Sequence, residues 1–184
     1  MTRDGRLIHL DFATACAGGN AIQVLNTSVP SGSSAQSKGT LIPLQASTFA
    51  LQTPENKLDI YTVSQSGIAK KGTVENVCKD PILAHRVYDN RLLLACGISS
   101  SNGLAVASLT SIQLIHLDAV NVVASASPTD SSGIAGMAFD NTHPKLYVLS
   151  NRSLVQLATF DFSENTSKLD VKTNFSLKNI LDKL

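Results

Sequence analysis

The sequence predicts an all-β fold of β-propeller-type blades, a partial or reduced propeller, with one short C-terminal helix. Apolar runs of about four to eight residues recur along the chain, and Gly, Ser, Asn, Asp and Pro separate them. Almost none of these runs has helical periodicity. A polar turn followed by a basic residue also precedes several of the runs. Together these features are typical of short antiparallel strands joined by hairpins.

The apolar runs predict about a dozen short strands. Each has the length and the flanking turn residues of a strand rather than of a helix. The predicted strands are residues 7–12, 21–25, 40–44, 47–51, 58–63, 82–88, 92–96, 104–109, 112–117, 120–124, 134–139, 146–150 and 154–160.

The recurring turns favour a propeller. Asp4-Gly5-Arg6, Glu55-Asn56-Lys57 and Asp89-Asn90-Arg91 each stand directly before an apolar strand, at irregular spacings of a few tens of residues. Propeller blades without a strict repeat have this arrangement. An antiparallel β-sandwich produces similar hairpins, so it stays as the alternative fold.

Composition limits the classes of function. Of 184 residues, 43% are hydrophobic and 16% charged, which is a composition that folds, and the length favours one domain. The net charge is +1, and the chain has no Trp and only 5% aromatic residues, so it lacks the basic surface and the stacking platform for nucleic acid. The most apolar stretch, residues 104–126, contains Gln113, His116 and Asp118, which disfavour a membrane span. We therefore expect an intracellular protein, in nucleus or cytoplasm.

Two segments differ from the strand pattern. Residues 26–38 are a Ser/Gly-rich tract and are predicted to be a surface loop within a blade region of residues 1–165. Residues 166–184 are predicted to be a tail whose last part, 175–184, forms an amphipathic helix. Its apolar residues are expected to dock on a sheet or on a partner. They are Phe175, Leu177, Ile180, Leu181 and Leu184.

Several segments resemble a known family in their order and spacing. They are Asp80-Pro81-Ile82 with Val87 and Asp89, the run 92–97 that ends at Gly97, the loop 100–104, Gly133-Ile134 with Gly136-Met137, and 146–150. The pattern resembles the large triple-propeller scaffolds. These comprise the large subunit of the damage-specific DNA-binding protein, the propeller subunit of splicing factor 3b, and the large subunit of the cleavage and polyadenylation specificity factor.

The resemblance implies a non-catalytic hub that holds other subunits of a nuclear complex, in RNA processing or ubiquitin ligation. It covers residues 4–162 but rests on hydrophobic pattern and turns. Ala105, Thr110 and Ala138 depart from the family, where Arg, Gly and an aromatic residue are usual. Members of the family are several times longer, so the resemblance implies a fragment or a reduced version. No contact residue of the family can be carried over.

The residues with potentially catalytic or metal-binding side chains form no recognisable site pattern. His9 and His116 share a Leu-Ile-His-Leu context followed by Asp11 and Asp118, which fits a solvated strand face better than a repeated catalytic or metal pair. A propeller hydrolase would need acids converging on a channel. The candidates are Asp11, Asp59, Asp89, Asp118 and Asp140.

Cofactor and metal sites are not predicted either. Cys16, Cys78 and Cys96 stand far apart, so we expect mostly buried thiols rather than a disulfide or a zinc site. No phosphate loop, nucleophile elbow or helical His pair is present.

The sequence therefore predicts a non-catalytic protein-interaction scaffold, not an enzyme, that binds other protein subunits and no cofactor, nucleic acid, membrane or small-molecule substrate. A stand-alone β-sandwich binding module is the alternative, and a propeller hydrolase a lesser one. Because blades that do not close a ring leave apolar faces open, we expect the isolated chain to self-associate or to be poorly soluble.

Overall fold

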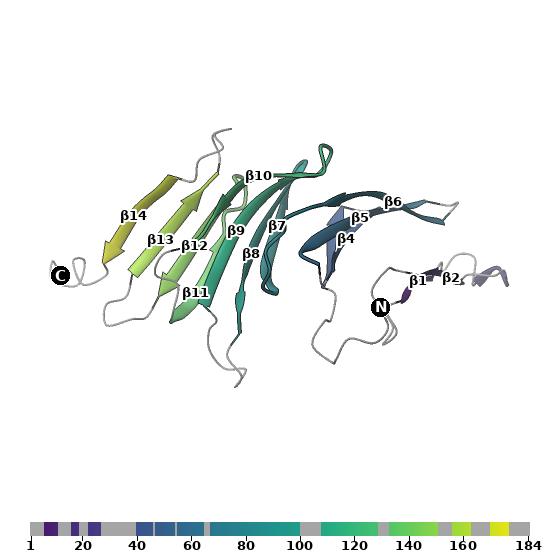
Figure 1. Cartoon of the computed structure of the whole chain (residues 1–184), viewed down its shortest axis with the longest axis horizontal. Coiled ribbons are helices and arrows are strands. Elements are labelled where there is room, and N and C mark those ends of the chain that lie inside the picture. The colour runs from purple at the N-terminus through teal and green to yellow at the C-terminus, as the bar shows by residue number, and fades with distance from the viewer. Residues whose placement is uncertain are drawn as a thin grey trace. The chain divides into compact units, whose positions relative to one another are not determined.

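The structure is a computed structural model that divides into two units, Met1–Glu75 and Asn76–Leu184. It describes residues 6–10, 16–18, 22–26, 40–45, 47–53, 55–64, 67–99, 108–128, 133–150, 156–162 and 170–176. Figure 1 shows that the regular structure in these residues consists of antiparallel sheets. The prediction of a β-dominated fold is confirmed.

The first unit contains a two-stranded and a four-stranded antiparallel sheet. The two-stranded sheet pairs β1 (Arg6–Leu10) with β2 (Ile22–Asn26). The four-stranded sheet is a meander in which each strand pairs with the next along the chain. Its strands are β3 (Leu41–Gln45), β4 (Thr48–Thr53), β5 (Lys57–Ser64) and β6 (Gly67–Val74).

The second unit contains two further four-stranded meanders. The first consists of β7 (Ile82–Tyr88), β8 (Arg91–Ile98), β9 (Ser108–His116) and β10 (Asn121–Ala126). The second consists of β11 (Ile134–Phe139), β12 (Lys145–Ser150), β13 (Gln156–Asp161) and β14 (Asp170–Ser176). A four-stranded antiparallel meander is the unit from which propeller blades are built.

The two sheets of the second unit pack face to face through a shared apolar core. Leu93, Ala95 and Leu114 of β7–β10 belong to the same buried cluster as Leu146 and Phe160 of β11–β14. Figure 1 shows these sheets side by side, and the space-filling view shows the teal-to-green residues of the unit as one unbroken surface. Removing such side chains from water is the main stabilising contribution to this packing.

Local sequence explains how the strands alternate and turn. In β3, Ile42 and Leu44 are buried while their neighbours are exposed, as expected for a strand with one face on a core. The two-residue turn between β7 and β8 starts at Asp89, which has a φ of 47°. Asp and Asn tolerate this left-handed conformation better than other side chains, which explains the polar turns in the sequence.

The strand predictions need two corrections. Residues 67–74 form β6, which was not predicted, because its Gly and Lys residues interrupt the apolar pattern. The predicted strands 104–109 and 112–117 join at residues 108–116 in one strand, β9, while residues 101–107 lie outside the described part.

The predicted tail is partly wrong. Residues 170–176 form β14, which pairs with β13, so the sheet extends beyond residue 165. Phe175 and Ser176 therefore lie in a strand, and the predicted helix 175–184 does not begin at Phe175. Residues 177–184 lie outside the described residues, and there the helix stays a prediction. Of the predicted loop 26–38, Asn26 ends β2 and the rest lies outside the described residues.

Val120 is expected to be a strained position. It has a φ of 53° in the turn before β10, a conformation that costs a β-branched residue on the order of 1–3 kcal/mol. Val120→Asn should therefore raise the free energy of unfolding by about 1 kcal/mol, measured by urea denaturation. Val123→Asn, at a partly exposed position of β10 where φ is not positive, is the matched control and should not stabilise. Equal effects of both changes would contradict the assignment of strain.

Candidate interaction surface

Three turns of the second unit gather at one end of its sheets, and we call residues 89–90, 117–120 and 140–144 the turn end. In an antiparallel meander the β7–β8 and β9–β10 turns fall at the same end, and Leu117 N donates a 2.8 Å hydrogen bond to Asn90 O. Tyr88 OH donates a 2.8 Å bond to Asp140 O and so ties the β11–β12 turn to the neighbouring sheet. The turn end is one connected polar surface.

Asp140 organises the β11–β12 turn. Its Oδ1 accepts hydrogen bonds from Thr142 N at 2.8 Å, His143 N at 2.9 Å and Thr142 Oγ1 at 3.0 Å. These bonds, the one from the Thr142 backbone first, hold the pKa of the Asp140 carboxyl well below its usual range. The carboxylate therefore caps the turn, which is a structural role.

Tyr88 connects the two sheets from a mostly buried position. Burial raises the pKa of the Tyr88 phenol to about 12, so the hydroxyl stays protonated and can donate to Asp140 O. The guanidinium of Arg86 lies 5.9 Å from the centroid of the Tyr88 ring, within cation–π range. Tyr88 lies at the end of β7, and Asp140 lies in a turn that its own carboxylate caps. The bond between them therefore holds the turn end rigidly.

His116 and Asp118, which the sequence assigns to a solvated strand face rather than to a catalytic pair, make contacts in the turns of the second unit. His116 Nδ1 accepts a 3.2 Å bond from Ala119 N within its own turn, and Asp118 Oδ2 accepts a bond from the Asn90 side chain. His9 lies in β1, where only the backbone is described, and Asp11 lies outside the described residues. His116 and Asp118 thus shape the turn end separately.

The aspartates proposed for a hydrolase do not share one site where they are described. Asp118 and Asp140 are engaged in different turns, with different partners. Asp59 lies in the first unit, inside its own network. Within the residues that the structure describes, no group of three or more His, Cys, Asp or Glu residues could hold a metal ion.

Asp59 is a buried carboxylate that sequence analysis did not single out for a structural role. Asp59 Oδ1 lies 2.8 Å from Lys70 Nζ and accepts a 2.7 Å bond from Thr73 Oγ1, while Oδ2 accepts a 3.4 Å bond from Tyr61 OH. The residue is only 3% exposed. Burial, and then the Asp59 charge, raise the pKa of Tyr61 to about 12. This network links β5 to β6, and only the register of the two strands brings its members together.

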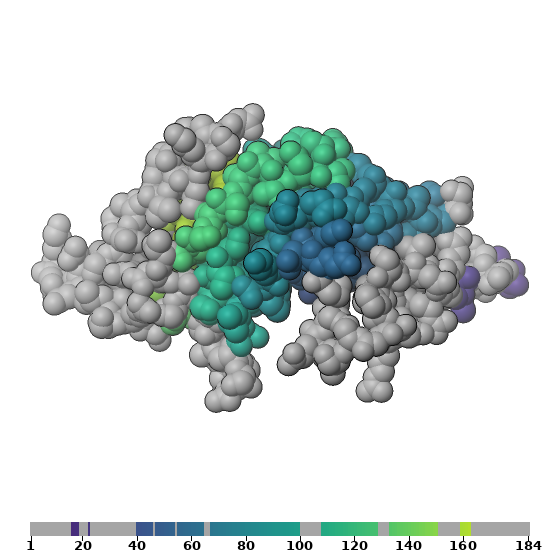
Figure 2. Space-filling view, in the orientation of Figure 1, coloured from purple at the N-terminus to yellow at the C-terminus, as the bar shows by residue number. Residues whose placement is uncertain are grey.

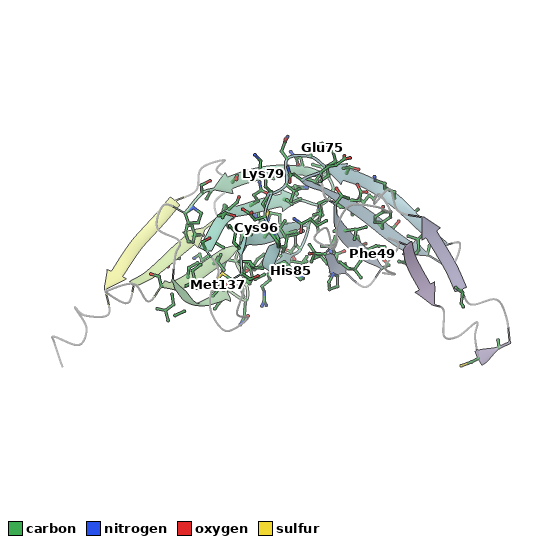
Figure 3. The ribbon with its side chains drawn as sticks, turned by 60° about the horizontal axis from the view of Figure 1, so that its bottom comes forward. Phe49, Glu75, Lys79, His85, Cys96 and Met137 are labelled. Carbon is green, nitrogen blue, oxygen red and sulfur yellow. A yellow bond between two sulfur atoms is a disulfide. The ribbon has the colours of Figure 1, made fainter. Side chains whose placement is uncertain are left out.

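The expectation of separate, mostly buried thiols is wrong. The structure joins Cys78 to Cys96 in a disulfide, and Cys16 is exposed. Figure 3 shows Cys96 within the β7–β10 sheet. A separation of 18 residues matches no sequence pattern, which is why the pairing was not predicted.

Gln113 binds the segment that precedes β7, which contains Asn76 and Cys78. Its Oε1 accepts a 2.9 Å bond from Cys78 N, and its Nε2 donates a 3.1 Å bond to Asn76 O. Gln113 is 6% exposed, and both ends of its amide are satisfied. Together with the disulfide, this residue fixes the entry of the chain into β7.

The outward face of the β11–β14 sheet is more open than the face on the core. Leu146 and Val148 of β12 point into the core and are 0% and 6% exposed. Their neighbours Tyr147 and Leu149 alternate to the opposite face and are half-buried. Ala138, opposite Tyr147 in the register, is exposed. The ion pair between Lys145 Nζ and Asp161 Oδ2, at 3.1 Å, lies on this face, which we call the outer face.

Of the predicted docking residues, the structure describes only Phe175. It pairs in register with Leu157 in the β13–β14 ladder. Leu177, Ile180, Leu181 and Leu184 lie outside the described residues, so their docking role stays a prediction. In the described part of the chain, no helix has the length and hydropathy that crossing a membrane requires.

His85 gives a prediction for the pH dependence of stability. Burial lowers the pKa of His85 below its ordinary value of 6.5, so in the folded state the imidazole resists a proton that the unfolded chain accepts. The free energy of unfolding should therefore fall as the pH drops through 6.5 toward the lower folded pKa. His85→Gln should weaken this dependence, measured by urea denaturation between about pH 8 and pH 5. If the free energy of unfolding had the same pH dependence in wild type and variant, this role of His85 would be contradicted. Figure 3 labels His85.

Solved structures similar to this chain are β-propeller domains. The Myceliophteria thermophila Cps50 (Swd1) β-propeller domain matches 94% of this chain and 53% of its own, with a TM-score of 0.50 and 12% identity. The structure of KlHsv2 with a Gly-Ser linker in place of loop 6CD also matches over 94% of this chain and 53% of its own length, with a TM-score of 0.51 and 10% identity. The fold is therefore of the propeller type. No protein-family model and no curated protein matches the chain.

The chain spans about half the length of these propeller chains. Identities of 10–12% show the fold alone. The predicted propeller is confirmed over the sandwich, while the triple-propeller family stays a resemblance of sequence pattern.

Proposed function

We propose that the chain is a non-catalytic protein-interaction scaffold, a subunit or segment of a multiprotein complex, and that it binds a protein partner through the turn end. Propellers hold turns on rigid sheets, and binding residues concentrate on such supported loops. The observation that carries the proposal is the Tyr88 OH to Asp140 O bond, which joins the turns of two sheets into one surface.

The chemistry of the turn end supports binding rather than catalysis. Asp140 is occupied by three hydrogen bonds within its own turn, and Asp118 by the Asn90 side chain. Exposed Asp89, Ala119 and Asn141 leave a mixed polar surface around them. Such a surface resembles the polar part of a protein–protein interface.

The finer assignment rests on the resemblance to the triple-propeller scaffolds. With that resemblance, we propose that the protein acts in the nucleus, in a complex for RNA processing or ubiquitin ligation, with the cytoplasm as the other compartment, and that its partners are protein subunits. The docking of Leu177, Ile180, Leu181 and Leu184 on a partner belongs to this proposal.

Affinity capture of the full chain from cells, quantified by mass spectrometry, tests the scaffold proposal. Ala119→Arg with Asn141→Arg places two bulky cations on two exposed sites of the turn end. We expect this variant to capture at least about tenfold less of the specific partner. A tenfold loss of affinity corresponds to about 1.4 kcal/mol of binding free energy.

The matched control is Ala69→Arg with Ser125→Arg, two exposed strand residues outside the turn end. It should retain the partner. Equal capture by both double variants would contradict a binding role for the turn end.

A further inference from the structure

The Cys78–Cys96 disulfide joins a segment outside the strands to the interior of a sheet. Cys96 lies in β8, where it pairs in register with Ile82 of β7 and with Ser111 of β9. Cys78 lies in residues 76–81, which precede β7 and contain no strand, and we call them the latch segment. The bond therefore connects a partner that two ladders hold to a partner that no ladder holds.

Hydrogen bonds also hold the latch segment on the sheet. Gln113 Oε1 accepts a 2.9 Å bond from Cys78 N, and its Nε2 donates a 3.1 Å bond to Asn76 O. Gly97 N donates a 3.0 Å bond to Pro81 O. Single hydrogen bonds contribute little net stability compared with a covalent cross-link. The disulfide is therefore the main fastening of the segment.

Reduction of the disulfide should move Cys78 rather than Cys96. Two sulfur atoms that are not bonded need a larger separation than a disulfide allows. The ladders to β7 and β9 keep Cys96 in place. Movement of Cys78 pulls its backbone N–H away from Gln113, and it opens the cover over Val77, which is 2% exposed. The oxidised structure is thus the closed state of an element that has an open state.

We propose that the Cys78–Cys96 pair is a redox latch, which holds the latch segment on the sheet when oxidised and releases it when a dithiol reduces it. A thiolate of the dithiol attacks the sulfur of Cys78, and Cys96 leaves as a thiolate that takes a proton. The second thiol of the reductant then breaks the mixed disulfide and releases Cys78 as a thiol. Two electrons pass to the two cysteines, and the dithiol becomes a disulfide.

The latch goes beyond the scaffold function and does not depend on it. In an oxidising compartment the latch segment stays closed. The nucleus and the cytoplasm keep thiols reduced, so there the segment closes only when an oxidant such as glutathione disulfide acts on the pair. That reaction forms the Cys78–Cys96 bond and converts the oxidant to two glutathione thiols.

Hydrogen exchange of the full chain, with and without dithiothreitol, tests the proposal. Thiol titration should detect only Cys16 before reduction and all three cysteines after it. We expect reduction to speed amide exchange at least about tenfold in the latch segment and at Gly97, while exchange in β12 stays unchanged. Glutathione disulfide should restore the slow exchange.

Two cysteine variants separate the latch from the other thiol. Cys78→Ser should give fast exchange in the latch segment with or without dithiothreitol. Cys16→Ser, which removes the exposed cysteine, is the matched control and should respond to dithiothreitol as wild type does. Circular dichroism shows whether each variant is folded, and reduction of wild type tests the latch even where Cys78→Ser does not fold.

Three outcomes would overturn the redox latch. The first is that Cys78 and Cys96 remain free thiols after treatment with glutathione disulfide. The second is that reduction leaves exchange in the latch segment unchanged. The third is that reduction speeds exchange in β12 as much as in the latch segment, because the bond would then stabilise the whole unit rather than one segment.

Discussion

Gly97→Ala is expected to destabilise the protein by about 3 kcal/mol or more. A Cβ at Gly97 would overlap the backbone oxygen of Ser108 and lie 2.9 Å from Leu83 Cδ1. The backbone cannot easily retreat, because Gly97 N donates a 3.0 Å bond to Pro81 O. The strands β8 and β9 must therefore separate at this point, which disturbs the ladder beside the core. Urea denaturation of wild type and variant measures the effect.

Gly136→Ala is the matched control. Gly136 lies in β11, its φ is not positive, and a Cβ there would have nothing within 4 Å. The change should therefore alter stability by less than about 1 kcal/mol, and it can stabilise by restricting the unfolded chain. Similar losses for both glycines would show that the close approach of β8 and β9 at Gly97 is absent.

Asp59→Ala is expected to lower the free energy of unfolding by about 3 kcal/mol. The change leaves the hydroxyls of Tyr61 and Thr73 without their carboxylate acceptor inside the β3–β6 sheet. Buried polar groups that lose a partner retain the cost of leaving water without a compensating bond. Thermal or urea unfolding measures the loss.

Lys70→Ala separates the buried network from the ion pair. The Lys70 side chain is 45% exposed, so solvent screens its interaction with Asp59, and its removal should cost about 1 kcal/mol or less. An Asp59→Ala effect no larger than the Lys70→Ala effect would contradict the structural role of the buried carboxylate.

The sequence predicted most strands because their residues alternate or form apolar runs with polar turns. β7 and β12 agree with the predicted strands to within a residue. β6 contains Lys70, Lys71 and two glycines, and its pairing with β5 determines its structure more than its own composition does. β14 was missed because its seven residues include only two large apolar ones, Val171 and Phe175, and Phe175 was grouped with the helical stripe of residues 177–184.

The turn end could be predicted only in part. The sequence predicted a polar turn at residues 89–91, but not that Tyr88 ties this turn to the one at residues 140–144 in the neighbouring sheet. That bond connects residues 52 positions apart, so it depends on the packing of one sheet against another. The same reason applies to the Gln113 bonds with Asn76 and Cys78. Hydrogen bonds that follow from tertiary packing leave no local pattern in a single sequence.

Hydrogen exchange, measured on the full chain alone and bound to the partner that it captures, tests the scaffold function most directly. The account predicts slower exchange in all three turns of the turn end together, residues 89–90, 117–120 and 140–144, because the Tyr88–Asp140 bond makes them one surface. Protection confined to the turns of one sheet, or absent from all three, would contradict it.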